Sequence, residues 1–468
     1  MSETLVPERA APAAAASDLP TTGGEAASAS GATRKHRAAQ SAAYKALYTA
    51  TGLFTAGLTE ARLKADIFDG AAMGRMVDGM TAEIDHAAKT VSVAYADDMP
   101  PRIAAWRPVL GATQLPIGAT KDAVRHLPNV PAEFRPPETD HLAWPMGDAD
   151  ATAPGSAALD ALVEQAFDPA TFGGVTWGVA VLKGGKILAE RYGRGYDVHT
   201  SQRTNSAAKS VACSVIGVAV RQGLVDIHEK GALAEWRRPG DPRGEIAIND
   251  LLHMNSGLYT EAAGNPQQEL YYGGAAAAER SALNIVDSPP GARWIYAGSD
   301  TILAVRAVRQ ALADDARHLR YPFEELLWKL GMTRTVCEVD WNGDFLMSGD
   351  MWSTLRDMAR FGLFYLADGV WNGERLLPEG WSRYVATPAP AQPNSADGRG
   401  YGAQFWLFGP KQRLPEGCYA AAGARGQYVM IVPEHDLVVV RRGFDLEPGF
   451  NIARFTRHVL ATLGLGDA

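Results

Sequence analysis

The stretch TNSAAKSVACSVIGVAV, residues 204–220, is apolar almost throughout and carries a single lysine near its start. Such a run predicts a helix that begins near Asn205 and is buried on nearly all its faces. Ser206 and Lys209 stand three positions apart, so a helix places their side chains on one face. Burial and the positive end of the helix dipole both lower the pKa of a lysine. An amine near neutrality can take the proton of a neighbouring hydroxyl, which makes a serine nucleophilic without a histidine.

A structural alternative exists for Lys209, because a lysine at a helix start can also extend its ammonium to solvent. The Ser-x-x-Lys spacing occurs once in the chain, at the head of this buried helix. The pattern therefore favours a catalytic pair, and the solvent-reaching lysine remains the alternative.

The segments on either side of this helix predict the fold. Residues 175–193, VTWGVAVLKGGKILAERYG, form two strand-like runs around Gly184-Gly185, a strong signal for a two-residue hairpin. Residues 428–443 form another strand–turn–strand unit, and residues 451–464 a closing helix. The intervening chain is mostly helical. The pattern predicts an α+β fold in which strands from both ends make one antiparallel sheet flanked by helices, with an inserted helical subdomain at about residues 205–400.

The N-terminal third divides into three parts. Residues 1–40 are rich in Ala, Ser, Gly and Thr, and are expected to form a disordered tail. Residues 41–150 are expected to form an N-terminal extension with a strand pair near residues 90–108, ending in a Pro-rich surface linker. The main domain is then expected to occupy residues 151–468.

Composition limits the class of protein. The 468-residue chain is 46% hydrophobic, with a net charge of −8 and a pI near 5.7, so nothing points to nucleic acid or an anionic membrane surface. Three scattered cysteines indicate neither a metal site nor a disulfide framework. Residues 41–58 are too weakly apolar to span a membrane and predict a surface-packed helix. With no export signal, a cytoplasmic location is expected, with a periplasmic one as the alternative. The sequence carries no indication of oligomeric state.

Five segments, in this order and rough spacing, carry a family resemblance together with NSAAKS: IAINDLLHMNSGL, PPGARWIYAGSDTILAV, FLMSGDMWSTLRDMARFGLFYL, GYGAQFWL and AAAGARGQYVMIVPEHDLVVV. They resemble the serine β-lactamase/penicillin-binding superfamily over roughly residues 150–465. The greatest likeness is to class C β-lactamase-related serine hydrolases, which include esterases and nylon-oligomer hydrolases.

The resemblance implies a role for each matching residue. Ser206 matches the acylated nucleophile and Lys209 its proton-transfer partner. Tyr296 matches the tyrosine that moves a proton between nucleophile and leaving group, although a core or rim tyrosine is its structural alternative. The backbone N–H groups of Ser206 and Ala424 would form the oxyanion hole.

Two positions depart from the family pattern and bear on substrate binding. Gly298 stands where the family's Tyr-x-Asn element has Asn, and Ala421-Ala422-Gly423 stands where many members have Lys-Thr-Gly or His-x-Gly, with their cation or hydroxyl. Gly298 and Gly423 are therefore candidate substrate-binding positions that contribute no polar side chain. Arg425 could return a positive charge to that side of the site, although a solvated arginine on a turn is equally compatible with the sequence.

Other side chains have weaker functional signals. His253 predicts a residue on a helix face rather than a base, and Ser256 a structural turn. Four aromatic residues lie in segments that line the cleft in relatives and together suggest an apolar pocket: Tyr259, Tyr271, Tyr272 and Trp352.

The expected function is therefore hydrolysis of an ester or amide bond in a small molecule through a Ser206 acyl-enzyme, with no metal or organic cofactor. A β-lactamase or D-Ala-D-Ala peptidase is the alternative among enzymes. A non-catalytic binding descendant of the fold is the alternative from another class.

Overall fold

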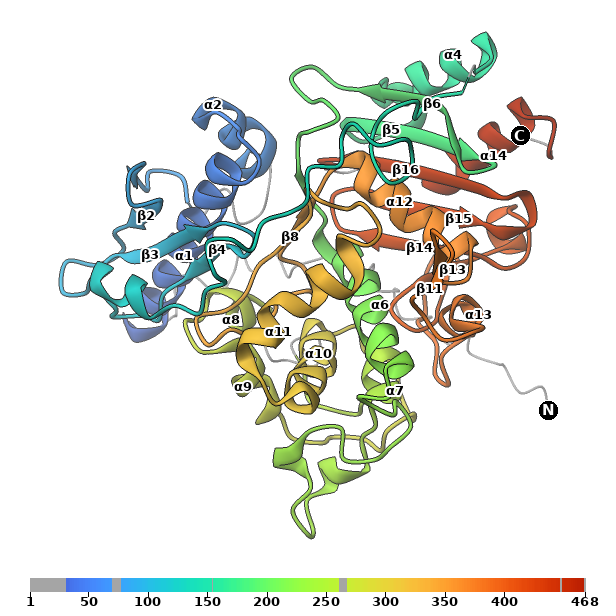
Figure 1. Cartoon of the computed structure of the whole chain (residues 1–468). Coiled ribbons are helices and arrows are strands. Elements are labelled where there is room, and N and C mark those ends of the chain that lie inside the picture. Colours follow the sequence, from blue (N-terminus) through green and yellow to red (C-terminus); the bar gives the residue numbers. More distant parts are fainter. Residues whose placement is uncertain (1–30, 70–76, 154, 261–266, 447, 467–468) are drawn as a thin grey trace, which may run out of the picture.

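The structure, a computed structural model, describes residues 31–69, 77–153, 155–260, 267–446 and 448–466. Its largest sheet is antiparallel and has seven strands in the order β12-β13-β14-β15-β16-β5-β6 (Figure 1). The strands are β5 (Thr176–Lys183), β6 (Lys186–Tyr192), β12 (Gly400–Tyr401), β13 (Trp406–Phe408), β14 (Cys418–Gly423), β15 (Gln427–Val432) and β16 (Leu437–Gly443). β5 pairs with β16, with Val440 opposite Ala180. This confirms the predicted α+β class, in which strands from both ends of the main domain pair within one antiparallel sheet.

The alternation of side chains along β5 explains why helices cover both faces of the sheet. Val179 and Val181 pack with α4 (Ala157–Gln165) and α14 (Ile452–Thr462), whereas Ala180 and Leu182 share a core with α6 (Ala208–Arg221) and α12 (Leu355–Leu366). The predicted hairpin is confirmed, because Gly184 and Gly185 both adopt positive φ, +59° and +74°, between β5 and β6.

The middle of the chain is mainly helical, as expected. Its helices are α7 (Ile248–Leu252), α8 (Gln267–Tyr272), α9 (Ala277–Ala282), α10 (Gly298–Leu312) and α11 (Asp315–Pro322). A small sheet joins β7 (Gln202–Arg203), β9 (Met351–Ser353) and β8 (Val336–Cys337). Residues 208–219 of α6 are all buried, so the predicted helix that is apolar on all its faces is also confirmed.

The N-terminal part packs the long helix α1 (Gly31–Phe54) against a four-stranded antiparallel sheet, shown in blue in Figure 1. Its strands are β1 (Ala82–Asp85), β2 (Thr90–Val93), β3 (Arg102–Arg107) and β4 (Gly111–Gln114). The predicted strand pair is confirmed as β2 and β3, with Val91 opposite Ala104.

Two expectations about this part were wrong. The disordered tail was expected to reach residue 40, but α1 begins at Gly31, and Ala39 and Gln40 are buried; residues 1–30 lie outside the described residues. The helix expected to pack on the surface is instead enclosed. Nearly all side chains from 39 to 50 are buried, and α1 contacts both the four-stranded sheet and α8. Alanines at many of these positions allow this close packing without a strongly apolar sequence.

The Pro-rich passage crosses the molecule between the N-terminal sheet and β6 (Figure 1). It is anchored by Trp144, which is buried, donates its indole N–H to the Gly185 carbonyl at 2.8 Å, and lies under the Arg360 guanidinium. The linker is therefore fixed to the hairpin turn at this point.

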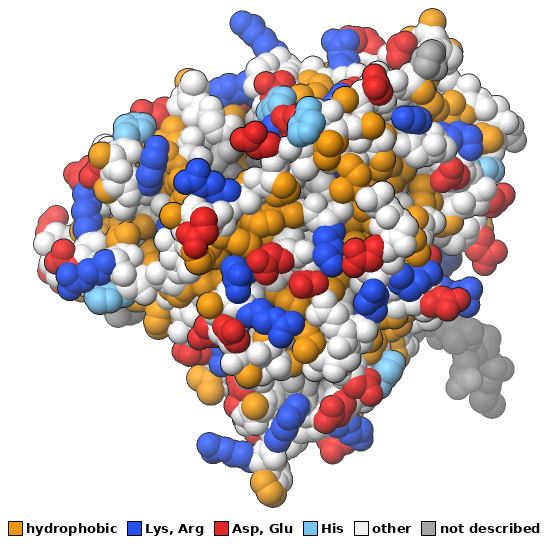
Figure 2. All heavy atoms as spheres, in the orientation of Figure 1, with side chains coloured by type: hydrophobic (Ala, Val, Ile, Leu, Met, Phe, Trp, Pro, Cys, Tyr) orange, Lys and Arg blue, Asp and Glu red, His pale blue; other side chains and the backbone are white. Residues whose placement is uncertain are grey.

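Basic and acidic side chains are interspersed over the face of the molecule in Figure 2. No helix among the described residues is long and apolar enough to cross a membrane. Within the same residues no group of three or more potential ligands could hold a metal ion, and the three cysteines are free and buried.

Candidate active site

Ser206 lies in a tight turn that is held by hydrogen bonds to β9 of the small sheet. A 3₁₀ turn, Asn205–Ala207, precedes α6 directly. The backbone N–H and hydroxyl of Thr204 both donate to the Met351 carbonyl on β9, at 2.9 and 3.0 Å. Asn205 has a left-handed backbone, φ +47°, which asparagine tolerates better than most residues. The sequence at 204–206 thus holds the hydroxyl of Ser206 at a defined position.

Lys209 is buried behind Ser206, and the solvent-reaching alternative is wrong. Its side chain is 1% exposed, and Nζ donates to the Ser348 carbonyl at 2.6 Å. Nζ also lies 3.5 Å from Ser206 Oγ, a long hydrogen bond that a small shift would tighten. The i, i+3 spacing therefore brings the two groups together as expected.

Tyr296 lies next to Lys209. The lysine Nζ sits 4.9 Å from the centre of the tyrosine ring, within cation–π range. The ring packs among Trp294, Tyr401 and Trp406, with centroids 5.8–6.0 Å away. Tyr296 is half-buried, so it joins an aromatic cluster and the lysine at the same time.

The end of β14 packs directly against the Ser206 turn. A Cβ on Gly423 would lie 2.3 Å from the Thr204 carbonyl oxygen and 2.9 Å from the Ser206 nitrogen, so only glycine fits there. Asn205 Nδ2 donates to the Ala424 carbonyl at 2.8 Å and ties the turn to the strand end. Ser206 and Ala424 are thereby held side by side. The sequence did not single out Asn205, whose role depends on this contact across 219 residues.

A pocket of about 210 Å³ opens beside Ser206. Of the residues expected at the site, Ser206, Ala424 and Arg425 line it, whereas Gly298 is buried at the start of α10 and Gly423 lies beneath Ser206. Of the four aromatic residues expected in the cleft, Tyr271, Tyr272 and Trp352 line the pocket and Tyr259 does not. His253 and Ser256 are buried outside it; the His253 ring is bonded to the Asn249 carbonyl and the Ser256 hydroxyl to the Leu258 N–H.

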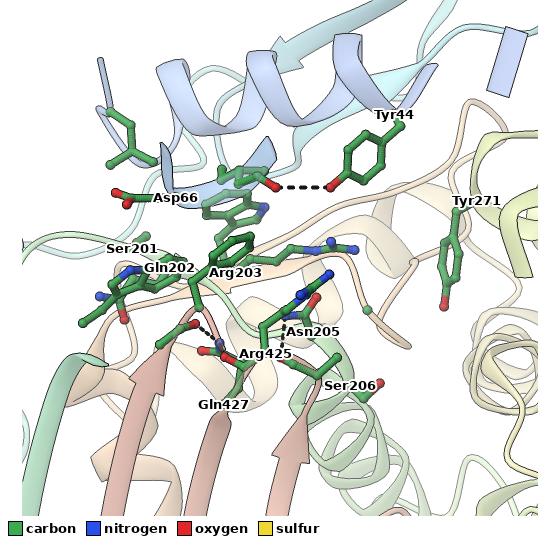
Figure 3. Close-up of a pocket in the computed structure, with 18 of the residues that line it drawn as sticks. Tyr44, Asp66, Ser201, Gln202, Arg203, Asn205, Ser206, Tyr271, Arg425 and Gln427 are labelled. Atoms are coloured by element: carbon green, nitrogen blue, oxygen red, sulfur yellow. Dashed lines mark hydrogen bonds between the residues drawn. The ribbon is translucent and has the colours of Figure 1, made fainter. Parts of the chain in front are cut away.

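One wall of the pocket comes from the N-terminal part of the chain. Tyr44 on α1, Leu58 after it, and Asp66 and Ile67 on the π-helical turn η1 (Lys64–Phe68) all line the pocket. Figure 3 shows the helix that carries Tyr44 across the pocket from Ser206, with Arg203 and Arg425 between them. No sequence motif marks this wall, because its four side chains are of common types and lie more than 130 positions from Ser206.

Arg203 connects the pocket to a buried network. Its guanidinium lies 3.0 Å from Asp350 Oδ1 and 4.1 Å from the centre of the Tyr48 ring. The Tyr48 hydroxyl donates to the same Asp350 oxygen at 3.0 Å and is bonded to the Tyr272 hydroxyl. Burial raises the pKa of Tyr48 and of Tyr272, so both are neutral donors near pH 7. The network fixes α1 and α8 to the strand that precedes Ser206.

A second pair of hydroxyls faces the pocket near Lys209. Tyr271 OH and Ser348 Oγ form a short hydrogen bond, and both residues line the pocket. Because the backbone carbonyl of Ser348 accepts from Lys209, the Ser348 residue touches the lysine and Tyr271 together. Sequence reasoning named Tyr271 but missed Ser348.

Comparisons with known proteins bear on the family and the fold of the chain. A family profile described as Beta-lactamase matches residues 159–441. The chain is 24% identical to a 6-aminohexanoate-dimer hydrolase of Paenarthrobacter ureafaciens over 283 residues, 56% of this chain and 70% of that protein.

Solved structures give the same fold. A family VIII carboxylesterase superposes with a TM-score of 0.54 at 14% identity, covering 67% of this chain and 99% of the other. A penicillin-binding protein homologue from Caulobacter crescentus gives 0.52 at 14% identity, covering 66% and 99%. The family resemblance of the sequence motifs is thus confirmed, and the chain belongs to the Beta-lactamase family.

Proposed function

We propose that the protein is a serine hydrolase that cleaves an ester or linear amide bond through an acyl-enzyme on Ser206. The observation that carries the proposal is the buried Lys209 amine, 3.5 Å from Ser206 Oγ at the edge of a pocket. A buried lysine beside a serine is costly to keep unless its proton affinity is used.

In this mechanism Lys209 and Tyr296 together take the hydroxyl proton of Ser206. Oγ attacks the carbonyl carbon, and the oxyanion is stabilised by the backbone N–H groups of Ser206 and Ala424. The bond to the leaving group breaks as Tyr296 returns the proton to the departing alcohol or amine. A water molecule, deprotonated by the same pair, then attacks the acyl-enzyme, which releases the acid and restores the Ser206 hydroxyl.

The segment from Ala421 to Gly423 favours esters and linear amides over β-lactams. Ala421, Ala422 and Gly423 on β14 carry no cation or hydroxyl that could hold the carboxylate of a β-lactam or a peptide terminus. The relatives named above as a 6-aminohexanoate-dimer hydrolase and a carboxylesterase agree with this preference.

The test is hydrolysis of short p-nitrophenyl esters, with intact mass measured after a fluorophosphonate pulse. The wild type should turn over and gain one adduct, and Ser206→Ala should lose more than about a hundredfold in kcat/KM and gain none. Ser210→Ala is the matched control, because this serine lies four residues further along, on α6, and its hydroxyl donates to the Gln404 carbonyl instead. An unchanged rate in Ser206→Ala contradicts the proposal. Slow acylation by nitrocefin without ester turnover would instead indicate a penicillin-binding protein.

A further inference from the structure

The pocket extends from Ser206 on one side only. It includes Ser206 and Ala424, the proposed oxyanion pair, but neither Lys209 nor Tyr296 is among the residues that line it. In the proposed mechanism, on which this inference rests, the leaving group departs toward Tyr296 because it receives its proton there. The part of the substrate that enters the pocket is then the acyl group.

The floor of the pocket is a stack of aromatic rings. Trp177 lies between Tyr196, at 5.1 Å, and Phe444, at 5.9 Å, with interplanar angles of 26° and 7°. The Arg62 and Arg425 guanidiniums cover the two ends of the stack, at 4.3 and 5.2 Å from the outer rings. The stack is therefore a rigid and mostly apolar surface.

The opposite wall is formed by Tyr44, Leu58 and Ile67. These residues precede residue 159, where the match to the family profile begins, so the wall lies outside the part of the chain that the family shares. The Tyr44 hydroxyl donates to the Ile67 carbonyl, and Asp66, next to Ile67, is bonded by Tyr196 at 2.9 Å. The wall is thus attached to the aromatic floor.

The charged groups bordering the pocket are already engaged within the protein. Asp350 pairs with Arg203, and Arg62 pairs with Asp66 at 2.8 Å. Arg425 donates to the Asp445 carbonyl and lies on the Phe444 ring. With these charges engaged, the pocket suits a neutral acyl chain better than one with a charged end.

At about 210 Å³ the pocket is smaller than the roughly 300–1,000 Å³ of sites that enclose drug-sized ligands. We propose that the segment from Tyr44 to Ile67 is the closing wall of an acyl pocket, and that it restricts the enzyme to esters or amides of short, apolar carboxylic acids. Leu58 and Ile67 are then the residues that determine chain length.

The experiment measures kcat/KM on p-nitrophenyl esters from acetate to decanoate. The wild type should prefer acyl chains of about two to six carbons, since a methylene that does not fit costs about 10–200-fold. Ile67→Ala should raise the ratio of octanoate to butyrate turnover at least about tenfold. Leu58→Trp should lower the ratio of hexanoate to acetate. Because Leu58 is only half-buried, Leu58→Trp should fold, and it tests the role of the wall in chain-length selectivity if Ile67→Ala does not fold.

Ile84→Ala is the control, because Ile84 lies on β1 of the same N-terminal part but does not line the pocket. Its chain-length profile should match the wild type. Unchanged profiles in the folded pocket variants, with butyrate still hydrolysed, overturn the inference and leave the proposed function intact. If the variants change selectivity only when the leaving group is varied at constant acyl chain, the pocket holds the leaving group and the inference fails. No ester turnover and no Ser206 adduct in the wild type would refute the proposed function itself.

Discussion

At the scale of single residues, replacing the buried amine of Lys209 should affect activity far more than stability. Lys209→Met should lower kcat/KM on p-nitrophenyl butyrate by more than about a hundredfold. Its free energy of unfolding should stay within about 2 kcal/mol of wild type, because an apolar side chain no longer has to bury a polar amine, and this gain offsets the lost bond to the Ser348 carbonyl. Denaturant unfolding and steady-state kinetics measure the two effects.

Lys183→Met is the matched control for this variant. Lys183 also donates to a backbone carbonyl at 2.6 Å, that of His435, but it lies at the far end of β5 from the pocket. It should retain wild-type activity. Lys209→Met activity above about a tenth of wild type would contradict the proton-transfer role.

Gly423 tests the contact between β14 and the nucleophile turn. Gly423→Ala places a methyl group against backbone atoms of Thr204 and Ser206, which cannot move without shifting the turn. Overpacking of this kind costs about 1–3 kcal/mol of stability. Because the Ser206 N–H moves with the turn, we expect acylation by fluorophosphonate to slow at least about tenfold.

Gly409→Ala is the comparison, since its nearest heavy atom to an added Cβ is 4.0 Å away and its backbone is extended, φ 174°. Equal acylation rates in the two variants would show that the approach of β14 to Ser206 is unimportant for the chemistry.

At the scale of elements, a buried carboxyl pair lies where α1 meets the main domain. Glu338 accepts from Thr51 on α1 at 2.6 Å and from the Ala112 N–H on β4 at 3.0 Å. Burial, together with the charge of Asp350, raises the pKa of Glu338 to about 8. Glu338 Oε2 and Asp350 Oδ2 are buried without a hydrogen-bond partner among the described residues. The pair is therefore most stable with a proton on Glu338.

This proton makes the stability of the fold depend on pH. The pKa of Glu338 is higher in the folded state than its ordinary value of 4.5, so the native state binds the proton more tightly than the unfolded chain. Its contribution is fully present below about pH 4.5 and is lost as the pH rises toward 8. Glu338→Gln should flatten this decline in denaturant midpoints measured at pH 5, 6.5 and 8.

Glu83→Gln, on the exposed side of β1, should leave the pH profile unchanged. Parallel profiles for wild type and Glu338→Gln would mean that Glu338 is ionised in the folded protein.

At the scale of the whole molecule, the N-terminal part should unfold together with the rest. Its helix α1 is tied to three later segments of the chain by hydrogen bonds of Gln40 with Glu269, Tyr48 with Asp350 and Thr51 with Glu338. We expect one thermal transition and equally slow hydrogen exchange at residues 39–50 and in α6. Exchange of α1 at much lower denaturant concentration than α6 would contradict this coupling.

The parts of the fold that could be predicted share a local signal. The Gly184-Gly185 hairpin, the fully apolar α6 and the spacing of Ser206 and Lys209 are each contained in fewer than twenty residues. The resemblance to a known family then supplied the distant positions Tyr296 and Ala424.

What the sequence could not predict depends on contacts between distant segments. The wall formed by Tyr44 and Ile67, the Asn205 bond to Ala424 and the Arg203–Asp350–Tyr48 network join residues more than 130 positions apart. The start and the burial of helix α1 could not be predicted, because its alanines have little hydropathy of their own and are buried by the surfaces that pack around them.

The pairing of β5 with β16 also has a consequence for synthesis on the ribosome. The hairpin gives β5 its first neighbour, β6, at once, but Lys183 must wait for Leu437, about 250 residues later, before its strand gains the second. At roughly 5–20 residues per second, the apolar edge of β5 stays uncovered for on the order of 10–50 s, long enough to invite aggregation. The α1–β4 unit is translated earlier and has all its strand partners by then. The nascent chain thus emerges with the strands of its N-terminal sheet already synthesised and its main sheet incomplete, and it is during that interval that a chaperone would act.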